Sequence, residues 1–318
     1  MRKNVRVITC DTARKQLICD FSSQVKLDDF RRLTDDQYSH NSLLAMRKDW
    51  NLFVEFCQSK QVCPLPAAAT AVRLFIERES SRRKYATLKR YAVTISLVHK
   101  LLALSDPTST TMVRTTMSRL RLDKKMDAHT TTAFTRQHLD KLTDTLSRST
   151  NAVDIRNLAL YHLMFECMLK RVELKRLSLK DLSLSGSETA VILGNDRYPL
   201  SQSAIHYLTK WLHVRGDYQG ALFSAIDKHG NVSQSALDDS SIYRILRAAS
   251  ERLKLDVNFS GQSPRVGAVA EMAARGVKVK EIQQYGRWQS AAMPYQYLGN
   301  RAQAAAEKLI FKTFKPWG

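Results

Sequence analysis

The sequence lacks the features that mark several common protein classes. None of its 318 residues belongs to an apolar run of the 18 or more residues that a membrane-spanning helix needs. The basic start, MRKNVRVITCDTARK, is not followed by the apolar segment of a secretory signal. Glycine and proline number only 11 and 7, which favours long helices over a fold of many strands. We therefore expect neither a membrane protein nor a secreted one, and a largely helical chain.

Motifs for metals, nucleotides and disulfides are missing as well. The histidines form no HxxxH pair, no CxxC occurs, and neither GxxxxGK[ST] nor GxGxxG is present. The five cysteines are odd in number and scattered, as is typical of a protein of the reducing cytoplasm (Cys10, Cys19, Cys57, Cys63 and Cys167). We expect a cytoplasmic protein without cofactor or metal ion.

Acidic residues are scarce beside basic ones. The chain has 50 Lys and Arg against 30 Asp and Glu, a net charge of +20. Residues 1–130 hold 24 basic and 13 acidic residues and the remainder 26 and 17, so the two parts carry +11 and +9. A hydrophobic fraction of 44% can still build cores. A positive field over the whole molecule predicts a polyanionic partner, with nucleic acid as the first candidate.

Apolar spacing divides the first part into an arm and a small helical domain. Residues 1–36 are weakly patterned and predict an arm with at most short helices. Residues 37–125 predict a helical domain, because apolar residues recur every three to four positions. We expect helices at 41–59, after the prolines of CPLPAAATAVRLFIERE, at 81–104 and at 110–122. In the second of these, Ala71, Leu74 and Phe75 are predicted to be buried.

A threonine-rich segment, residues 126–135, predicts a linker, and Thr135 suits the cap of a new helix. Residues 136–318 predict a mostly helical domain with one small antiparallel sheet. A long helix is expected at 154–177, followed by three short strands with a tight turn at Gly194, Asn195 and Asp196. Further helices are expected at 203–213, 239–253, 263–275, 280–284, 290–297 and 301–314. The fold class is mainly α, with an α+β second domain.

An ordered set of polar residues lies near the end of the chain. The segment FSGQSPRVGAVAEMAARGVKVKEIQQYGRWQSAAMPYQYLGN contains Gln262, Arg265, Trp288 and, nine residues later, Tyr297. Upstream, Lys170 stands three residues before Glu173 in CMLKRVELKRLSLKDL. This order and spacing resemble the catalytic domain of the tyrosine recombinase, or phage integrase, family. That family has a first arginine three residues before a glutamate, then His-x-x-Arg, a His or Trp beside a glycine, and a tyrosine.

The resemblance covers nearly the whole chain and implies DNA binding, integration and site-specific recombination. Tyr297 would be the nucleophile, joining DNA through a 3′-phosphotyrosyl bond that needs no cofactor. A free tyrosine, with a pKa of about 10, is a poor nucleophile, and attack on a phosphodiester builds negative charge. Lys170 and Arg265 would stabilise that charge, with Trp288 and Gln262 as hydrogen-bond donors. The catalytic set is therefore Tyr297, Arg265, Trp288, Lys170 and Gln262.

Three positions depart from the family pattern. Lys170 keeps the charge of an arginine but not its bidentate fork. Arg171 is a doubtful substitute, because adjacent residues on a helix point about 100° apart. Gln262 replaces a histidine and cannot shuttle a proton. The strand turn ILGNDRYPL lacks the family's lysine, offering Asn195, Asp196 and Arg197. A smaller departure is Arg287, which separates Gly286 from Trp288, and Tyr295 is an alternative nucleophile.

The basic residues of the first part predict the contacts with double-stranded DNA. Arg82, Arg83, Lys84, Lys89 and Arg90 have no acidic residue between Glu79 and Asp106 to offset them. Their place matches the helix that the family lays in the major groove, with Arg90 as the candidate base contact. The expected DNA-binding residues are Arg83, Lys84, Lys89, Arg90, Arg119 and Arg121, and Lys124 and Lys125 lie beside the linker.

The resemblance also implies a homo-tetramer on paired DNA sites. In the family the last helix docks on a neighbouring protomer, and Leu309, Ile310 and Phe314 form a suitable apolar stripe. Two other interpretations stay open. One is a DNA-binding protein of this fold with a decayed active site and a regulatory or accessory role. The other is a nicking and closing topoisomerase of the same chemistry, which would not need the docking helix.

Overall fold

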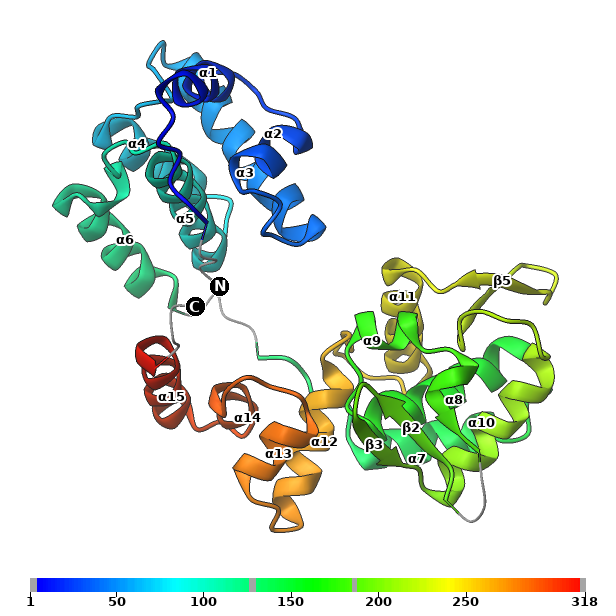
Figure 1. The fold of residues 1–318 in the computed structure, drawn as a ribbon. Coiled ribbons are helices and arrows are strands. Elements are labelled where there is room, and N and C mark those ends of the chain that lie inside the picture. The colour runs from blue at the N-terminus through cyan, green and yellow to red at the C-terminus, as the bar shows by residue number, and fades with distance from the viewer. Residues whose placement is uncertain (1–4, 126–129, 185–187, 315–318) are drawn as a thin grey trace. The chain divides into compact units, whose positions relative to one another are not determined.

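The computed structural model describes residues 5–125, 130–184 and 188–314, the last three without their side chains (Figure 1). The chain divides into two compact units, with the boundary in sequence between residues 129 and 130. This boundary falls in the predicted linker, of which residues 126–129 lie outside the described residues. As predicted, the chain is mainly helical with little sheet. None of the helices in the described ranges is long and apolar enough to cross a membrane.

The first unit is entirely helical. Ser39 caps its longest helix by accepting a hydrogen bond from the Ser42 N–H at 3.4 Å. The predicted helices at 41–59 and 110–122 are present to within one residue at each end. The elements are α1 (Asp11–Phe21), α2 (Leu27–Leu33), α3 (His40–Ser59), α4 (Ala69–Ser80), α5 (Tyr85–Leu101), a 3-10 turn (Pro107–Ser109) and α6 (Thr111–Asp123).

The N-terminal segment packs on this helical core, where the sequence suggested an arm. Phe21, Phe30 and Leu33 are at most 1% exposed. The indole N–H of Trp50 donates to the Phe21 carbonyl oxygen at 3.1 Å, which fixes the end of α1 on α3. Helix α1 buries only Phe21 of its 11 residues, so its sequence carries no periodic apolar signal.

Two details of the first unit differ from the prediction. Leu74 is 42% exposed, because Ala71, Val72, Phe75 and Ile76 form the buried face of α4. The helix expected at 81–104 is shorter, since α5 begins at Tyr85 after an extended Lys84.

The second unit is built around one fully buried helix. Every residue of α8 (Ala152–Glu166) from Arg156 to Phe165 is buried, as expected for a helix that is covered on all sides. Helices α7 (Arg136–Leu146), α10 (Gln202–Arg215) and α12 (Ser263–Ala274) pack against it (Figure 1). The remaining helices are α9 (Arg171–Arg176), η3 (Leu179–Asp181), α11 (Asp239–Arg252), α13 (Val279–Tyr285), α14 (Ala292–Tyr297) and α15 (Arg301–Phe314).

Two small antiparallel sheets complete this unit. The predicted one has the order β1 (Leu182–Ser183), β2 (Ala190–Leu193), β3 (Asp196–Pro199), with Val191 opposite Tyr198. Gly194 has a φ of 65°, which allows the tight turn between β2 and β3. The second sheet, β4 (Ser224–Ile226) and β5 (Val232–Ala236), was not predicted, because β5 is short and mostly polar.

The start of the second unit is anchored on α12. The Thr135 side chain caps α7 as predicted, accepting from the His138 N–H at 3.4 Å. The Phe134 N–H donates to the Ser263 carbonyl oxygen at 2.9 Å. A Cβ on Gly267 would lie 1.7 Å from the Phe134 carbonyl oxygen, so only glycine permits this approach. The backbone before α7 thereby fixes the helix that carries Arg265.

Candidate active site

The turn between α8 and α9 contributes the carbonyl oxygens that Arg265 and Arg287 bind. The sequence predicted one continuous helix at 154–177, which is wrong: α8 ends at Glu166 and α9 begins at Arg171. Met168 in this turn has a φ of 46°, and Lys170 is the extended N-cap of α9. The assumption that Lys170 and Arg171 lie on one helix therefore fails, and with it the reason for setting Arg171 aside.

Arg265 is the buried cation of the site, with 4% of its surface exposed. Its guanidinium donates to the carbonyl oxygens of Met168 and Gly286, the second at 2.6 Å. Its Cζ lies 4.1 Å from the centre of the Trp288 ring, in cation–π geometry. Burial, and then the charge of Arg287, lower the pKa of Arg265 to about 10, which leaves it protonated at neutral pH.

Arg287 is a structural cation, although in the sequence it is only the extra residue between Gly286 and Trp288. Its backbone φ is 57°. Its Nε and Nη2 donate to the two carboxylate oxygens of Glu173 at 3.1 and 2.9 Å. Further bonds reach the carbonyl oxygens of Cys167, Met168 and Tyr285 at 2.9 to 3.0 Å. Arg287 thus ties the turn before α9 to the segment that carries Trp288.

Glu173 joins Lys170 to this network. Its carboxylate accepts from the Lys170 backbone N–H at 2.7 Å and lies 3.0 Å from the Lys170 Nζ. Burial alone would raise the pKa of Glu173, but the bonds from Arg287 and Lys170 outweigh it and lower that pKa. The Lys170 ammonium is therefore present in the site, already paired with a carboxylate.

Trp288 packs between Arg265 and Tyr297. The ring centres of Trp288 and Tyr297 are 5.9 Å apart at 74°, an edge-on contact. The Trp288 ring lies directly against Gly286, where a Cβ would come within 1.8 Å of its Cζ3. Among the described residues no acceptor binds the indole N–H of Trp288, so it is available to a bound group.

The hydroxyl of Tyr297 donates a hydrogen bond to Oε1 of Gln262, which immediately precedes α12. Burial raises the pKa of Tyr297, and the positive charge of Arg265 partly offsets that rise. The fold therefore brings four of the five predicted catalytic residues into one set of contacts, Gln262, Arg265, Trp288 and Tyr297. Lys170 is linked to them through Glu173 and Arg287.

The β2–β3 hairpin supplies a tyrosine to the site rather than a cation. Arg197 donates to Ser183 Oγ at 3.1 Å and to the Glu188 carbonyl oxygen at 2.9 Å, within its own sheet. Tyr198 is 2% exposed and stacks under Arg287, whose Cζ lies 4.8 Å from the ring centre. No pattern in the sequence marks Tyr198, because its role depends on its contact with Arg287.

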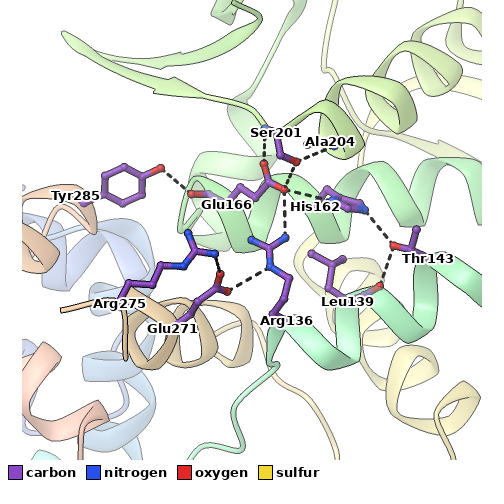
Figure 2. A network of polar contacts seen from close by, with 10 residues as sticks. All are labelled: Arg136, Leu139, Thr143, His162, Glu166, Ser201, Ala204, Glu271, Arg275 and Tyr285. Carbon is purple, nitrogen blue, oxygen red and sulfur yellow. Dashed lines mark hydrogen bonds and ion pairs between the residues drawn. The ribbon is translucent and has the colours of Figure 1, made fainter. Parts of the chain in front are cut away.

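A second polar network surrounds Glu166, the last residue of α8 (Figure 2). The Glu166 carboxylate accepts from the N–H and Oγ of Ser201 at 2.9 and 2.7 Å and lies 3.6 Å from Arg136. The Tyr285 hydroxyl donates to the Glu166 carbonyl oxygen at 2.8 Å. Because Cys167 and Met168 follow Glu166, this network fixes the carbonyl oxygens that Arg265 and Arg287 bind.

The arrangement can bind an anion beside a tyrosine hydroxyl. Arg265, Lys170 and the indole N–H of Trp288 supply positive charge and donors, and Tyr297 supplies the oxygen nucleophile. In the ranges that the structure describes, no group of three or more His, Cys, Asp and Glu side chains is placed to hold a metal ion.

The basic surface of the first unit is partly paired. Arg90 donates from Nε and Nη2 to the two oxygens of Asp49 at 2.8 Å each. Asp49 comes from α3 and its side chain is 1% exposed, so an acid does offset Arg90. Arg83 lies 3.6 Å from Glu79, and Arg119 lies 3.2 Å from Glu77. Lys84, Lys89 and Arg121 are exposed.

The last helix, α15, carries exposed apolar residues. Leu309 and Ile310 are 65% and 50% exposed, whereas Ala304 is 3% exposed. Lys308 Nζ lies 2.9 Å from Gln296 Oε1, which ties α15 to α14. The side chain of Phe314, the third residue of the predicted stripe, lies outside the described residues.

A mainly helical fold that joins a tyrosine, a tryptophan and a buried arginine in this way defines a tyrosine recombinase. The chain belongs to the phage integrase family, whose model matches residues 132–304. It is similar to the recombinase Cre of Escherichia phage P1, 25% identical over 92% of this chain and 90% of that one. It is also similar to an integrase/recombinase XerD homolog of Selenomonas ruminantium, 24% identical over 84% of each.

Solved structures give the same fold. The Tn1549 transposon integrase in complex with transposon right end DNA has a TM-score of 0.65 and 12% identity. The match covers 93% of this chain and 99% of that one.

Proposed function

We propose that the protein is a site-specific DNA recombinase that cuts and rejoins duplex DNA through Tyr297. The observation that supports this most directly is the packing of Tyr297 on Trp288 and of Trp288 on Arg265. The Tyr297 hydroxyl loses its proton as its oxygen attacks a backbone phosphorus. The bond from phosphorus to the 5′ oxygen breaks, and that oxygen takes up one proton, so the protons balance. The 3′-phosphotyrosyl bond keeps the energy for rejoining, so the reaction needs no cofactor.

Arg265 and Lys170 are assigned to the charge that develops on the phosphate oxygens, and Trp288 donates its indole N–H to the same group. Gln262 positions the tyrosine hydroxyl through its amide oxygen. Arg287 and Glu173 hold Lys170 and the carbonyl oxygens around Arg265, and act as positioning residues.

The first unit is proposed as the DNA core-binding domain and residues 136–318 as the catalytic domain. Lys84, Lys89 and Arg121 are exposed and suit phosphate contacts. Arg83, Arg90 and Arg119 are assigned to DNA as well, although each is paired with an acid in the free protein. The structure of the Tn1549 integrase, which has a similar fold, is a complex with transposon right end DNA, and this favours a duplex as the partner.

Assembly into a tetramer on paired sites is proposed through α15, whose Leu309 and Ile310 are exposed. Deletion of residues 306–318 should abolish recombination between two sites and spare cleavage at one site. Recombination that survives this deletion would argue for a different interface. The free thiols of the five cysteines favour action in the cytoplasm.

A DNA-binding protein without catalysis is not favoured, because the similar proteins are recombinases and integrases over most of their length. The proposed activity is tested with duplexes selected from a random pool by the full chain. A selected duplex is nicked near its centre, so that the cut fragment diffuses away. A recombinase accumulates a covalent protein–DNA complex that survives denaturing electrophoresis. A protein that binds the duplex and never forms this complex is not a recombinase of this type.

A further inference from the structure

Arg171 is a cation at the edge of the site that the five predicted catalytic residues do not include. It is exposed at the start of α9, and within residues 130–184 and 188–314 its side chain has no ion pair or hydrogen bond. The other cations here are already engaged. Lys170 is paired with Glu173, and Arg287 spreads its donors over Glu173 and three carbonyl oxygens. Arg171 therefore has a complete guanidinium available to a ligand.

The side chain of Arg171 lies across Gly261. A Cβ built on Gly261 would lie 2.7 Å from Cγ, 2.4 Å from Cδ and 2.8 Å from Nε of Arg171. The backbone of Gly261 does not have a positive φ, so glycine is required here for space rather than for conformation. The lack of a side chain at residue 261 permits the path that Arg171 takes.

Gly261 places the Arg171 side chain one residue before the hydrogen-bond partner of Tyr297. The next residue, Gln262, accepts the hydrogen bond of the Tyr297 hydroxyl. The same segment leads into α12, which carries Arg265 three residues later. The Arg171 side chain thus lies against the residue that precedes Gln262, while Arg265 packs on Trp288 from α12.

Resting on the proposed function, we propose that Arg171 is a further catalytic residue that binds the DNA phosphate attacked by Tyr297. A guanidinium matches two phosphate oxygens with two parallel hydrogen bonds, which the Lys170 ammonium cannot do. Arg265 and Arg171 then form the pair of guanidinium groups around the phosphate, and Lys170 adds a point charge. Gly261 serves the reaction by leaving room for Arg171.

Single-turnover cleavage of the nicked duplex at saturating protein tests the residue itself. Arg171→Ala should slow covalent-complex formation about 100-fold, as loss of one transition-state donor does. The rate of Arg171→Lys should lie between the rates of Arg171→Ala and the wild type. Arg176→Ala removes an exposed arginine from the same helix and should cleave at the wild-type rate. DNA affinity should change only a few-fold in each variant, since many cations contribute to it.

Gly261→Ala tests the geometry. Its methyl group meets a flexible side chain rather than backbone, so the protein should fold, as circular dichroism and urea unfolding would verify. It should slow cleavage by displacing Arg171. The double variant with Arg171→Ala should be no slower than Arg171→Ala alone, because the methyl group then has nothing to displace.

The outcomes separate this proposal from the proposed function. If the wild type forms the covalent complex and Arg171→Ala forms it equally fast, Arg171 is not catalytic and the recombinase function stands. If the rate losses of Gly261→Ala and Arg171→Ala multiply in the double variant, Gly261 acts through another group. The contact between Gly261 and Arg171 then does not serve the reaction. If the wild type forms no covalent complex, both proposals fail together.

Discussion

The hydroxyl of Tyr297 donates a hydrogen bond to the amide oxygen of Gln262. An amide oxygen accepts a hydrogen bond but cannot take the proton away. Burial raises the pKa of Tyr297 more than the charge of Arg265 lowers it, so the free protein holds a protonated tyrosine. Cleavage must therefore proceed without a titrating base at position 262.

The pH dependence of cleavage tests this relationship. The rate of covalent-complex formation in the wild type should show no inflection between pH 5.5 and 7.5 from residue 262. Gln262→His places an imidazole, with an ordinary pKa of about 6.5, on the tyrosine hydroxyl. The rate should then rise at least tenfold above that pH, as for a general base. An unchanged, flat profile in the variant would show that residue 262 does not contact the reacting hydroxyl.

The double variant Lys170→Arg with Gln262→His tests whether the site is weakened or inactive. Its rate at neutral pH should exceed that of the wild type by about 10- to 100-fold, because a general base and a further guanidinium are added. Most of the gain should come from Gln262→His, since Lys170 already delivers its charge. A protein that never positions DNA for attack would gain nothing from either change.

Glu173 should stabilise the second unit in a pH-dependent way. Glu173→Gln removes the charge that pairs with Arg287 and Lys170 and should lower the free energy of unfolding by about 1–3 kcal/mol at pH 7. Because the pKa of Glu173 is lowered by folding, this stability is present above its unfolded pKa of about 4.3. It is lost as the pH falls through the lower folded value.

Urea unfolding of both proteins from pH 3 to 8 measures the difference. The matched control is Glu188→Gln, a carboxylate whose side chain is 73% exposed and which should change stability little at any pH. Equal effects of Glu173→Gln and Glu188→Gln at neutral pH would contradict the role given to Glu173.

Arg90 should affect folding as well as DNA binding. Arg90→Ala leaves the Asp49 carboxylate buried without its bidentate partner and should destabilise the first unit by about 1–3 kcal/mol. Lys89→Ala removes an exposed charge beside it and should change stability by less than about 0.5 kcal/mol while weakening DNA binding. If thermal unfolding shows Arg90→Ala to be as stable as Lys89→Ala, the pair with Asp49 contributes nothing to folding.

Local patterns predicted most of the helices, since apolar spacing and caps act within a few residues. Trp50 and Phe53 mark α3 in this way, and the turn at Gly194 marks the first sheet. The break at Met168 could not be predicted, because the segment Cys-Met-Leu-Lys contains neither glycine nor proline. It is imposed by carbonyl oxygens that bind Arg265 and Arg287, more than 90 residues further along the chain.

The order and spacing of Gln262, Arg265, Trp288 and Tyr297 could be recognised in the sequence, and the structure brings these residues together. The partners of the charged residues could not be recognised in the sequence. Asp49 meets Arg90 from 41 residues away, and Glu173 meets Arg287 from 114 residues away. A continuous helix at 154–177 would point Arg171 away from Lys170, but the helix breaks between Glu166 and Arg171. Pairing of charges depends on tertiary contacts, which a linear pattern does not contain.

The most direct measurement is the identity of the amino acid that becomes attached to DNA. The covalent complex formed on a selected, nicked duplex is digested with nuclease and trypsin, and the modified peptide is sequenced by mass spectrometry. We expect the nucleotide to be joined through its phosphate to Tyr297. Tyr297→Phe should form no covalent complex, and Tyr295→Phe, changed two residues away, should form as much of it as the wild type. Attachment to any other residue, or a complex that persists in Tyr297→Phe, would contradict the account.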